Sequence, residues 1–116
     1  MAITQAQMAT ATNLLNGGLA VTSTATPALN GTYAVYSGFA PEGMQGQANA
    51  LALSASASFA DGSATLEWPD ITGVGHSFTP AQFHSLVVAC ANFVSQCTQY
   101  AYGVITTPPA ATATIP

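Results

Sequence analysis

The sequence has eight His, Cys, Asp and Glu side chains, the types that most often catalyse reactions or bind metal ions, and six of them lie between residues 67 and 97. They are His76, His84, Cys90, Cys97, Glu67 and Asp70. A metal site needs three or four ligands from His, Cys and carboxylates at suitable spacing. His84 and Cys90 are six residues apart, so they face away from each other on a helix, and no Cys-x-x-Cys or His-Glu-x-x-His pattern occurs. We therefore expect no metal site, and we interpret both histidines as structural.

Glu67 and Asp70 are a conceivable pair of glycosidase carboxylates. They flank a predicted turn, however, where a carboxylate can equally accept hydrogen bonds from turn amides. The sequence also lacks a Gly-x-Ser-x-Gly nucleophile motif and the Lys of a phosphate-binding loop. We expect no enzymatic activity and no cofactor.

Cys90 and Cys97 are the only two cysteines, and they are seven residues apart within a predicted helix. That spacing corresponds to a rise of about 10.5 Å, whereas a disulfide needs Cα atoms within about 7 Å. We therefore expect both to be small apolar core residues with no bond between them. A disulfide between two chains is the alternative.

The 116 residues include no Lys and no Arg, and four acidic residues give a formal net charge of −4. Fixed positive charge is what binds nucleic-acid phosphates and anionic lipid headgroups, so the composition argues against both as partners. So few charges also give only weak repulsion between copies of the chain. This favours a protein that works inside an assembly, with an unusual monomeric domain as the alternative.

The length fits one small domain. The N-terminal residues have neither the basic nor the apolar part of a signal peptide. No uninterrupted apolar stretch reaches the roughly 18 residues of a membrane-spanning helix. We therefore expect neither a signal peptide nor a membrane span.

Two segments have the pattern of a helix start. In residues 3–8, a Thr precedes a Gln by three positions, and Ile and Met flank them as a hydrophobic staple. This predicts a helix over residues 4–16, ended by two glycines. Residues 78–83 repeat the arrangement, with Thr79 as the cap and a Pro at the first helical position. They predict a long helix from Thr79 to Tyr102.

The remaining segments complete a predicted α+β fold. Residues 19–24 and 32–36 are rich in β-branched and aromatic residues and predict one pair of strands, and residues 64–68 and 75–78 predict a second. Residues 44–59 fit both strand alternation and helical spacing, and their Ala and Leu content favours a helix. We predict a single domain over residues 1–105: two short strand pairs, two shorter helices and one long C-terminal helix. Residues 106–116 are predicted to form an extended arm rich in Pro, Thr and Ala.

Apolar residues recur at helical spacing along the predicted helix from Thr79 to Tyr102. We predict that copies of the chain associate through this stripe, formed by Phe83, Leu86, Val87, Cys90, Phe93, Val94 and Cys97. The stripe is broad enough to cover both the chain's own sheet and a neighbouring copy, although covering the sheet alone is the ordinary use of such a face. The predicted product is a closed symmetric oligomer, a trimer, with the arm contacting an adjacent protein.

Several runs occur in an order that resembles a known group of proteins. They are Val21 to Ala34, then Trp68-Pro69-Asp70, Gly75-His76-Ser77-Phe78 and the helix start at Gln82-Phe83. Over roughly residues 19–100 the chain resembles small proteins of unknown function from the virion-structure modules of tailed bacteriophages and prophages. The resemblance implies a virion protein of a fibre, tail or capsid decoration, assembled in the bacterial host cytoplasm. It implies no catalytic residues.

Two other functions fit the same sequence. One is a fibre assembly factor, or chaperone, that leaves after the fibre has folded. The other is a carbohydrate-binding receptor tip that stacks sugars on Trp68, Tyr33 and Tyr36. For Trp68, burial in the core is the competing interpretation.

Overall fold

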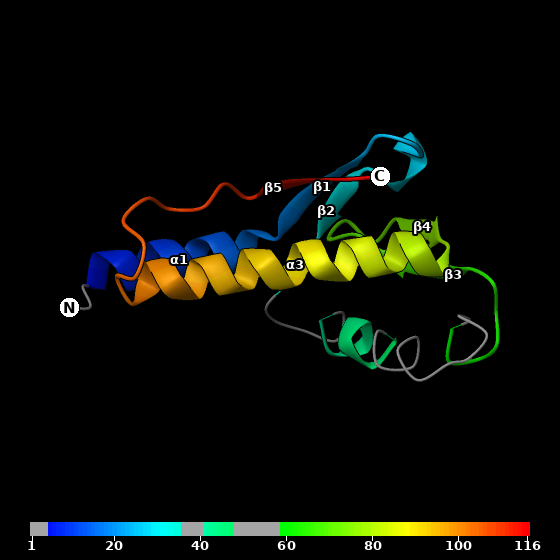
Figure 1. The fold of residues 1–116 in the computed structure, drawn as a ribbon, viewed down its shortest axis with the longest axis horizontal. Coiled ribbons are helices and arrows are strands. Elements are labelled where there is room, and N and C mark those ends of the chain that lie inside the picture. The colour runs from blue at the N-terminus through cyan, green and yellow to red at the C-terminus, as the bar shows by residue number, and fades with distance from the viewer. Residues whose placement is uncertain (1–4, 36–40, 48–58) are drawn as a thin grey trace.

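The computed structural model describes residues 5–35, 41–47 and 59–116. Within these ranges the chain forms the predicted α+β fold, elongated along its C-terminal helix, with dimensions of 47 × 28 × 24 Å (Figure 1). The helices are α1 (Gln5–Gly17), the short 3-10 helix η1 (Pro27–Leu29), the helical segment 41–47 and α3 (Pro80–Ala101). The strands are β1 (Leu19–Ser23), β2 (Gly31–Tyr33), β3 (Leu66–Pro69), β4 (Gly75–Phe78) and β5 (Thr112–Ile115).

The capping box that the sequence predicts at the start of α3 is present. The Thr79 hydroxyl accepts from the Gln82 amide at 3.3 Å, and the Gln82 side-chain oxygen accepts from the Thr79 amide at 2.9 Å. Pro80 occupies the first turn, where a missing N–H costs no helical bond. The helix ends before Gly103, which adopts a left-handed φ of 74°.

Helix α1 lies beside the C-terminal half of α3 (Figure 1). It ends at the predicted pair of glycines, and Gly18 continues the chain with a φ of 79°. A side chain at Gly18 would also meet the Tyr33 carbonyl oxygen, only 2.7 Å from the position of a Cβ. The predicted cap and staple of α1 involve residues 3 and 4, which lie outside the described ranges.

The first predicted strand pair is confirmed, and it belongs to a larger sheet. β1 pairs antiparallel with β2, and on its other side β1 pairs parallel with β5, giving the order β2-β1-β5. Residues 112–115 therefore belong to the domain and not to an arm beyond it, which corrects the predicted boundary at residue 105. Exposure alternates along β5 as expected for a strand with one buried face. The β-branched Ile115 is 3% exposed, whereas the threonines of β5 are exposed.

The second predicted strand pair is confirmed as the hairpin of β3 and β4, with Trp68 opposite His76. For the predicted helix over 44–59, residues 41–47 are helical, and residues 48–58 lie outside the described ranges. Phe59 is not helical, because its carbonyl accepts from Gly62 in a turn. The Asp-Gly pair that follows therefore belongs to this turn.

The core lies between α3 and the strands. Its largest fully buried side chains are Tyr33, Phe78, Phe83, Leu19, Leu29, Leu86 and Cys97. Phe83 lies at the centre of an aromatic group, with its ring edge-to-face against the rings of Phe59, Trp68 and Phe78 at centroid distances of 5.4–5.8 Å. The N-terminal half of α3 is thereby fixed to the β3–β4 hairpin.

Candidate functional site

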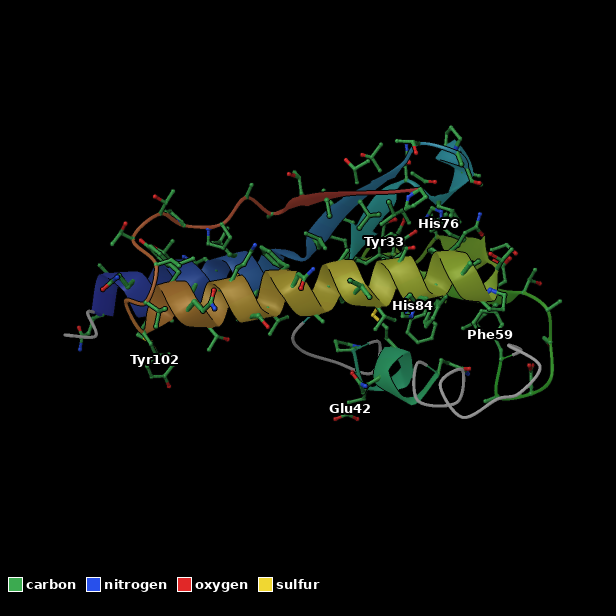
Figure 2. The ribbon with its side chains drawn as sticks, in the orientation of Figure 1. Tyr33, Glu42, Phe59, His76, His84 and Tyr102 are labelled. Atoms are coloured by element: carbon green, nitrogen blue, oxygen red, sulfur yellow. The ribbon has the colours of Figure 1, made fainter. Side chains whose placement is uncertain are left out.

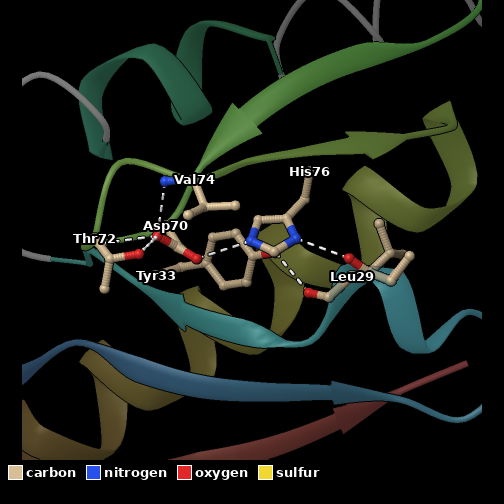
Figure 3. Close-up of polar contacts among 7 residues, drawn as sticks. Leu29, Tyr33, Asp70, Thr72, Val74 and His76 are labelled. Atoms are coloured by element: carbon tan, nitrogen blue, oxygen red, sulfur yellow. Dashed lines mark hydrogen bonds and ion pairs between the residues drawn. The ribbon is translucent and has the colours of Figure 1, made fainter.

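A polar cluster lies at the turn end of the β3–β4 hairpin (Figure 3). Asp70 follows β3, and His76 lies on β4. The Asp70 Oδ2 atom is 2.8 Å from Nε2 of His76, and the two side chains are only 10% and 9% exposed. An acidic side chain and a histidine in this arrangement are two components of many hydrolytic sites, so their other partners decide what they can do.

The second carboxylate oxygen of Asp70 is fully occupied by the turn that follows. Oδ1 accepts from the Thr72 amide at 2.8 Å, from the Thr72 hydroxyl at 2.6 Å and from the Val74 amide at 3.1 Å. These bonds and the bond from His76, which has the largest effect, lower the pKa of Asp70 well below its usual range. The interpretation of Asp70 as a turn residue is confirmed, and its oxygens are all engaged.

Both ring nitrogens of His76 face hydrogen-bond acceptors. Nδ1 lies 2.8 Å from the Ala28 carbonyl oxygen, which can only accept, and Nε2 faces the ionised Asp70 carboxylate, which also only accepts. Both partners are acceptors, so this arrangement favours the doubly protonated imidazolium over either neutral tautomer. The hydrogen bond from Asp70, followed by that to Ala28, raises the pKa of His76. In the imidazolium form the ring has no free lone pair with which to act as a general base.

Tyr33 closes the cluster from the sheet side. Its hydroxyl donates to the Leu29 carbonyl at 2.6 Å, and its ring packs edge-on against His76 at 5.6 Å. The side chain is completely buried, and burial, with a smaller contribution from the charge of Asp70, raises its pKa. The cluster thus ties the hairpin to β2 and η1, as does the bond from the Ile71 amide to the Thr32 carbonyl.

None of the hydrogen bonds just described involves Glu67, His84, Cys90 or Cys97. His84 is exposed on α3 (Figure 2). Cys90 and Cys97 are both buried, as predicted, and no disulfide joins them within the chain; burial raises the pKa of the Cys90 thiol to about 12. Across the described ranges, no group of three His, Cys, Asp or Glu residues comes together.

The predicted association stripe on α3 is largely inside the chain's own core. Five of its seven residues are at most 5% exposed: Phe83, Leu86, Cys90, Phe93 and Cys97. Only Val87 and Val94 are partly accessible, and they line a hollow of about 290 Å³ beside the helical segment 41–47. The five buried residues pack within the folded chain, which is the ordinary use of such a face.

The aromatic residues considered for sugar binding are not a stacking platform either. Tyr33 is buried, and Tyr36 lies outside the described ranges. Trp68 is half-buried and packs on Phe83, and a Cβ placed on Gly43 would be 2.9 Å from its ring. Its Nε1 is buried without a hydrogen-bond partner in the described chain. The competing interpretation, Trp68 packed against the core, describes it better.

Sequence reasoning missed an uncharged groove between α3 and β5. Its volume is about 440 Å³, and it is lined on the helix by Ser85, Val88, Ala89, Asn92 and Gln96, and on the strand by residues 112–115. Val88 is 43% exposed there. The alternating Thr-Ala-Thr-Ile run was the sequence signal for β5, but the partner strand is far away in the sequence.

Comparison with known proteins adds no relative to this description. No protein-family model matches the sequence, and no curated protein or solved structure shows significant similarity to it. In the described part of the chain, no helix has the length and hydropathy to cross a bilayer.

Proposed function

We propose that this chain is a self-associating structural protein with no enzymatic activity, and that it is a component of a bacteriophage virion. The observation that carries the proposal is the combination of exposed apolar side chains with very little charge. Within residues 5–35, 41–47 and 59–116, six large apolar residues are at least 39% exposed: Met8, Ile71, Val74, Val88, Tyr102 and Val104. The whole chain has four acidic side chains and no Lys or Arg, so copies repel each other weakly.

The state of the reactive groups agrees with a structural role. The His76 ring is held by the Ala28 carbonyl and by Asp70, and the Asp70 carboxylate is held by the amides of the turn. The two thiols are buried. These groups stabilise the fold. The hydroxyl beside the ion pair, that of Thr72, donates to the Asp70 carboxylate, whose lowered pKa makes it a weak base.

The position in a virion rests on the resemblance of residues 19–100 to virion-module proteins of tailed phages. A fibre, a tail and a capsid decoration are all repetitive assemblies, in which one chain contacts many copies of itself or of its neighbours. The burial of Tyr33 and the packing of Trp68 make the receptor-tip function the weaker alternative. The assembly-factor function differs only in whether the chain stays in the particle.

Two measurements test the proposal. Sedimentation velocity of the full chain at micromolar concentration should show an oligomer, and a monomer at every concentration would contradict self-association. Mass spectrometry of purified virions should detect the chain. Because the sequence has no Lys or Arg, the digestion must use chymotrypsin instead of trypsin. An oligomer that is absent from the particles would identify an assembly factor.

A further inference from the structure

Strand β5 forms an open edge of the three-stranded sheet. It is the last strand in the order β2-β1-β5, and no described strand lies on its outer side. The opposite edge is different, because β2 is joined to the β3–β4 turn by the bond from Ile71 to Thr32. The free edge of β5 is therefore the place where this sheet can grow.

The bonds to β1 show which backbone groups of β5 face outward. The backbone carbonyls of Ala111 and Ile115 accept from the amides of Ala20 and Thr24. The backbone N–H and C=O groups of the odd-numbered residues therefore point toward β1. Because peptide groups alternate in direction along a strand, the N–H and C=O groups of Thr112 and Thr114 point away from it. Two donors and two acceptors therefore line the outer side.

Apart from its short length of four residues, this edge has none of the features that usually prevent strands from pairing. Edge strands are commonly protected by a charged side chain, an inward-pointing charge, a bulge or a Pro within the strand. β5 reads Thr-Ala-Thr-Ile, without a charge or a Pro. Its threonine side chains are exposed and β-branched, which suits them to cross-strand pairs.

We propose that a second copy of this chain pairs with the free edge, β5 antiparallel to β5, around a two-fold axis at Ala113. This inference deepens the proposed function by naming its contact surface. Thr112 of each copy then lies opposite Thr114 of the other, and each of these two pairs exchanges both N–H···O bonds. Four hydrogen bonds join the copies into one six-stranded sheet.

The sequence of β5 selects this register over its neighbours. Outward-facing groups must meet each other, so the register can shift only in steps that keep this alternation. A shift one way would oppose Thr112 to Pro116, which has no N–H to donate. A shift the other way would oppose Thr114 to residue 110, which is outside the strand. Only the axis at Ala113 pairs strand residues with strand residues throughout.

The distribution of charge favours a second copy as the occupant. A partner with the same net charge of −4 can bind here only if the acidic groups stay apart. None of them lines the groove beside β5. Glu67 and Asp70 belong to the hairpin at the other edge of the sheet, and Glu42 lies on the opposite side of α3 from the sheet (Figure 2). Two copies therefore meet on uncharged surface.

The groove between α3 and β5 can accommodate side chains of the added strand. Directly opposite residues of an antiparallel pair share a face, so the partner's Ala113 points to the same side as this Ala113, toward α3. The groove there is floored by Val88, Ala89 and Asn92. The pairing covers the exposed Val88 and places the two α3 helices side by side beneath the joined sheet.

The test is a substitution that alters only the outer side of β5. Thr114→Pro removes an outward N–H and leaves every bond to β1 intact, since Pro is tolerated on the open side of an edge strand. Thr114→Val is the matched control, because it keeps the N–H and the branched shape. Two bonds are lost per pair of chains, so we expect dissociation of the pair to be favoured about 30-fold by Thr114→Pro and little changed by Thr114→Val. Sedimentation over a concentration series measures both, and thermal melting verifies that the variants fold.

A charge exchange tests the register itself. The double variant Thr112→Lys, Thr114→Lys places like charges opposite each other in both pairs and should separate the copies. The double variant Thr112→Lys, Thr114→Glu places opposite charges across both pairs and should restore association. If both variants associate equally, the antiparallel register around Ala113 is wrong.

The outcomes separate this inference from the proposed function. If the wild-type chain associates and Thr114→Pro associates as tightly, the edge is not the contact, while self-association stands. If the wild-type chain is monomeric throughout, self-association and this contact both fail. If Thr114→Pro is a folded monomer and Thr114→Val is not, the β5 edge is the contact.

Discussion

The ion pair of Asp70 and His76 gives this chain a positive side chain in the absence of Lys and Arg, and it makes stability depend on pH in two directions. Asp70 has a lowered pKa, so its contribution is complete above its ordinary value of 3.8 and is lost as the pH falls toward the folded value. His76 has a raised pKa, so its contribution is complete below its ordinary value of 6.5 and is lost as the pH rises through the folded value. Both contributions are complete only between these two ordinary values.

The melting temperature should therefore pass through a maximum in mildly acidic solution and fall on both sides. His76→Gln should remove most of the fall on the alkaline side, and the matched variant His84→Gln, at an exposed position of α3, should retain it. Circular dichroism melts in buffers from about pH 3 to about pH 9 measure this dependence. An alkaline side that is identical in wild type and His76→Gln would show that the imidazolium does not stabilise the fold.

Among the elements, α3 depends on a local cap that can be removed without touching the core. Thr79→Ala deletes the hydroxyl that accepts from Gln82, and we expect a loss of about 0.5–2 kcal/mol in the free energy of unfolding. Thr79→Ser keeps an acceptor at the same position and should restore most of the loss. Urea denaturation measures both variants, and an equal loss in the two would exclude the cap as the cause.

The face of α3 that packs inward can be tested with adjacent residues. Leu86 is 0% exposed and Val87 is half-buried. Leu86→Ala should therefore lower the free energy of unfolding by about 2–5 kcal/mol, and Val87→Ala by clearly less. Urea denaturation compares the two variants directly. A larger loss for Val87→Ala would mean that the helix is rotated from the orientation described.

These elements also show how far the sequence could predict the fold. The helix from Thr79 was predictable because its cap, first-turn Pro and terminal Gly are local signals. Its inward face was only partly predictable, because a stripe through Val87 and Val94 and one through Leu86 and Phe93 have nearly the same spacing, and only packing selects between them. The buried pair of rings, Tyr33 and His76, depends on the hairpin meeting β2, which no local pattern encodes.

At the scale of the whole molecule, none of the four acidic side chains lines the groove between α3 and β5. Self-association through this surface should therefore depend little on salt. A contact built on opposite charges weakens as salt screens it. Here the contact has no charged residue, and added salt only reduces the weak mutual repulsion of two chains of charge −4. Sedimentation at low and high sodium chloride should give nearly the same dissociation constant, with any change toward tighter association. A marked weakening in salt would contradict an uncharged contact.

The pairing of β1 with β5 also sets an order of events during synthesis. Ser23 bonds to Pro116 although the two are 93 positions apart. At about 5–20 residues per second, β1 leaves the ribosome several seconds before β5 exists. During that interval one side of β1 has no partner strand, and neighbouring nascent chains on the same message present the same side. A β5 from another copy fits β1 as well as the chain's own, so crowded synthesis favours exchange of this strand between chains.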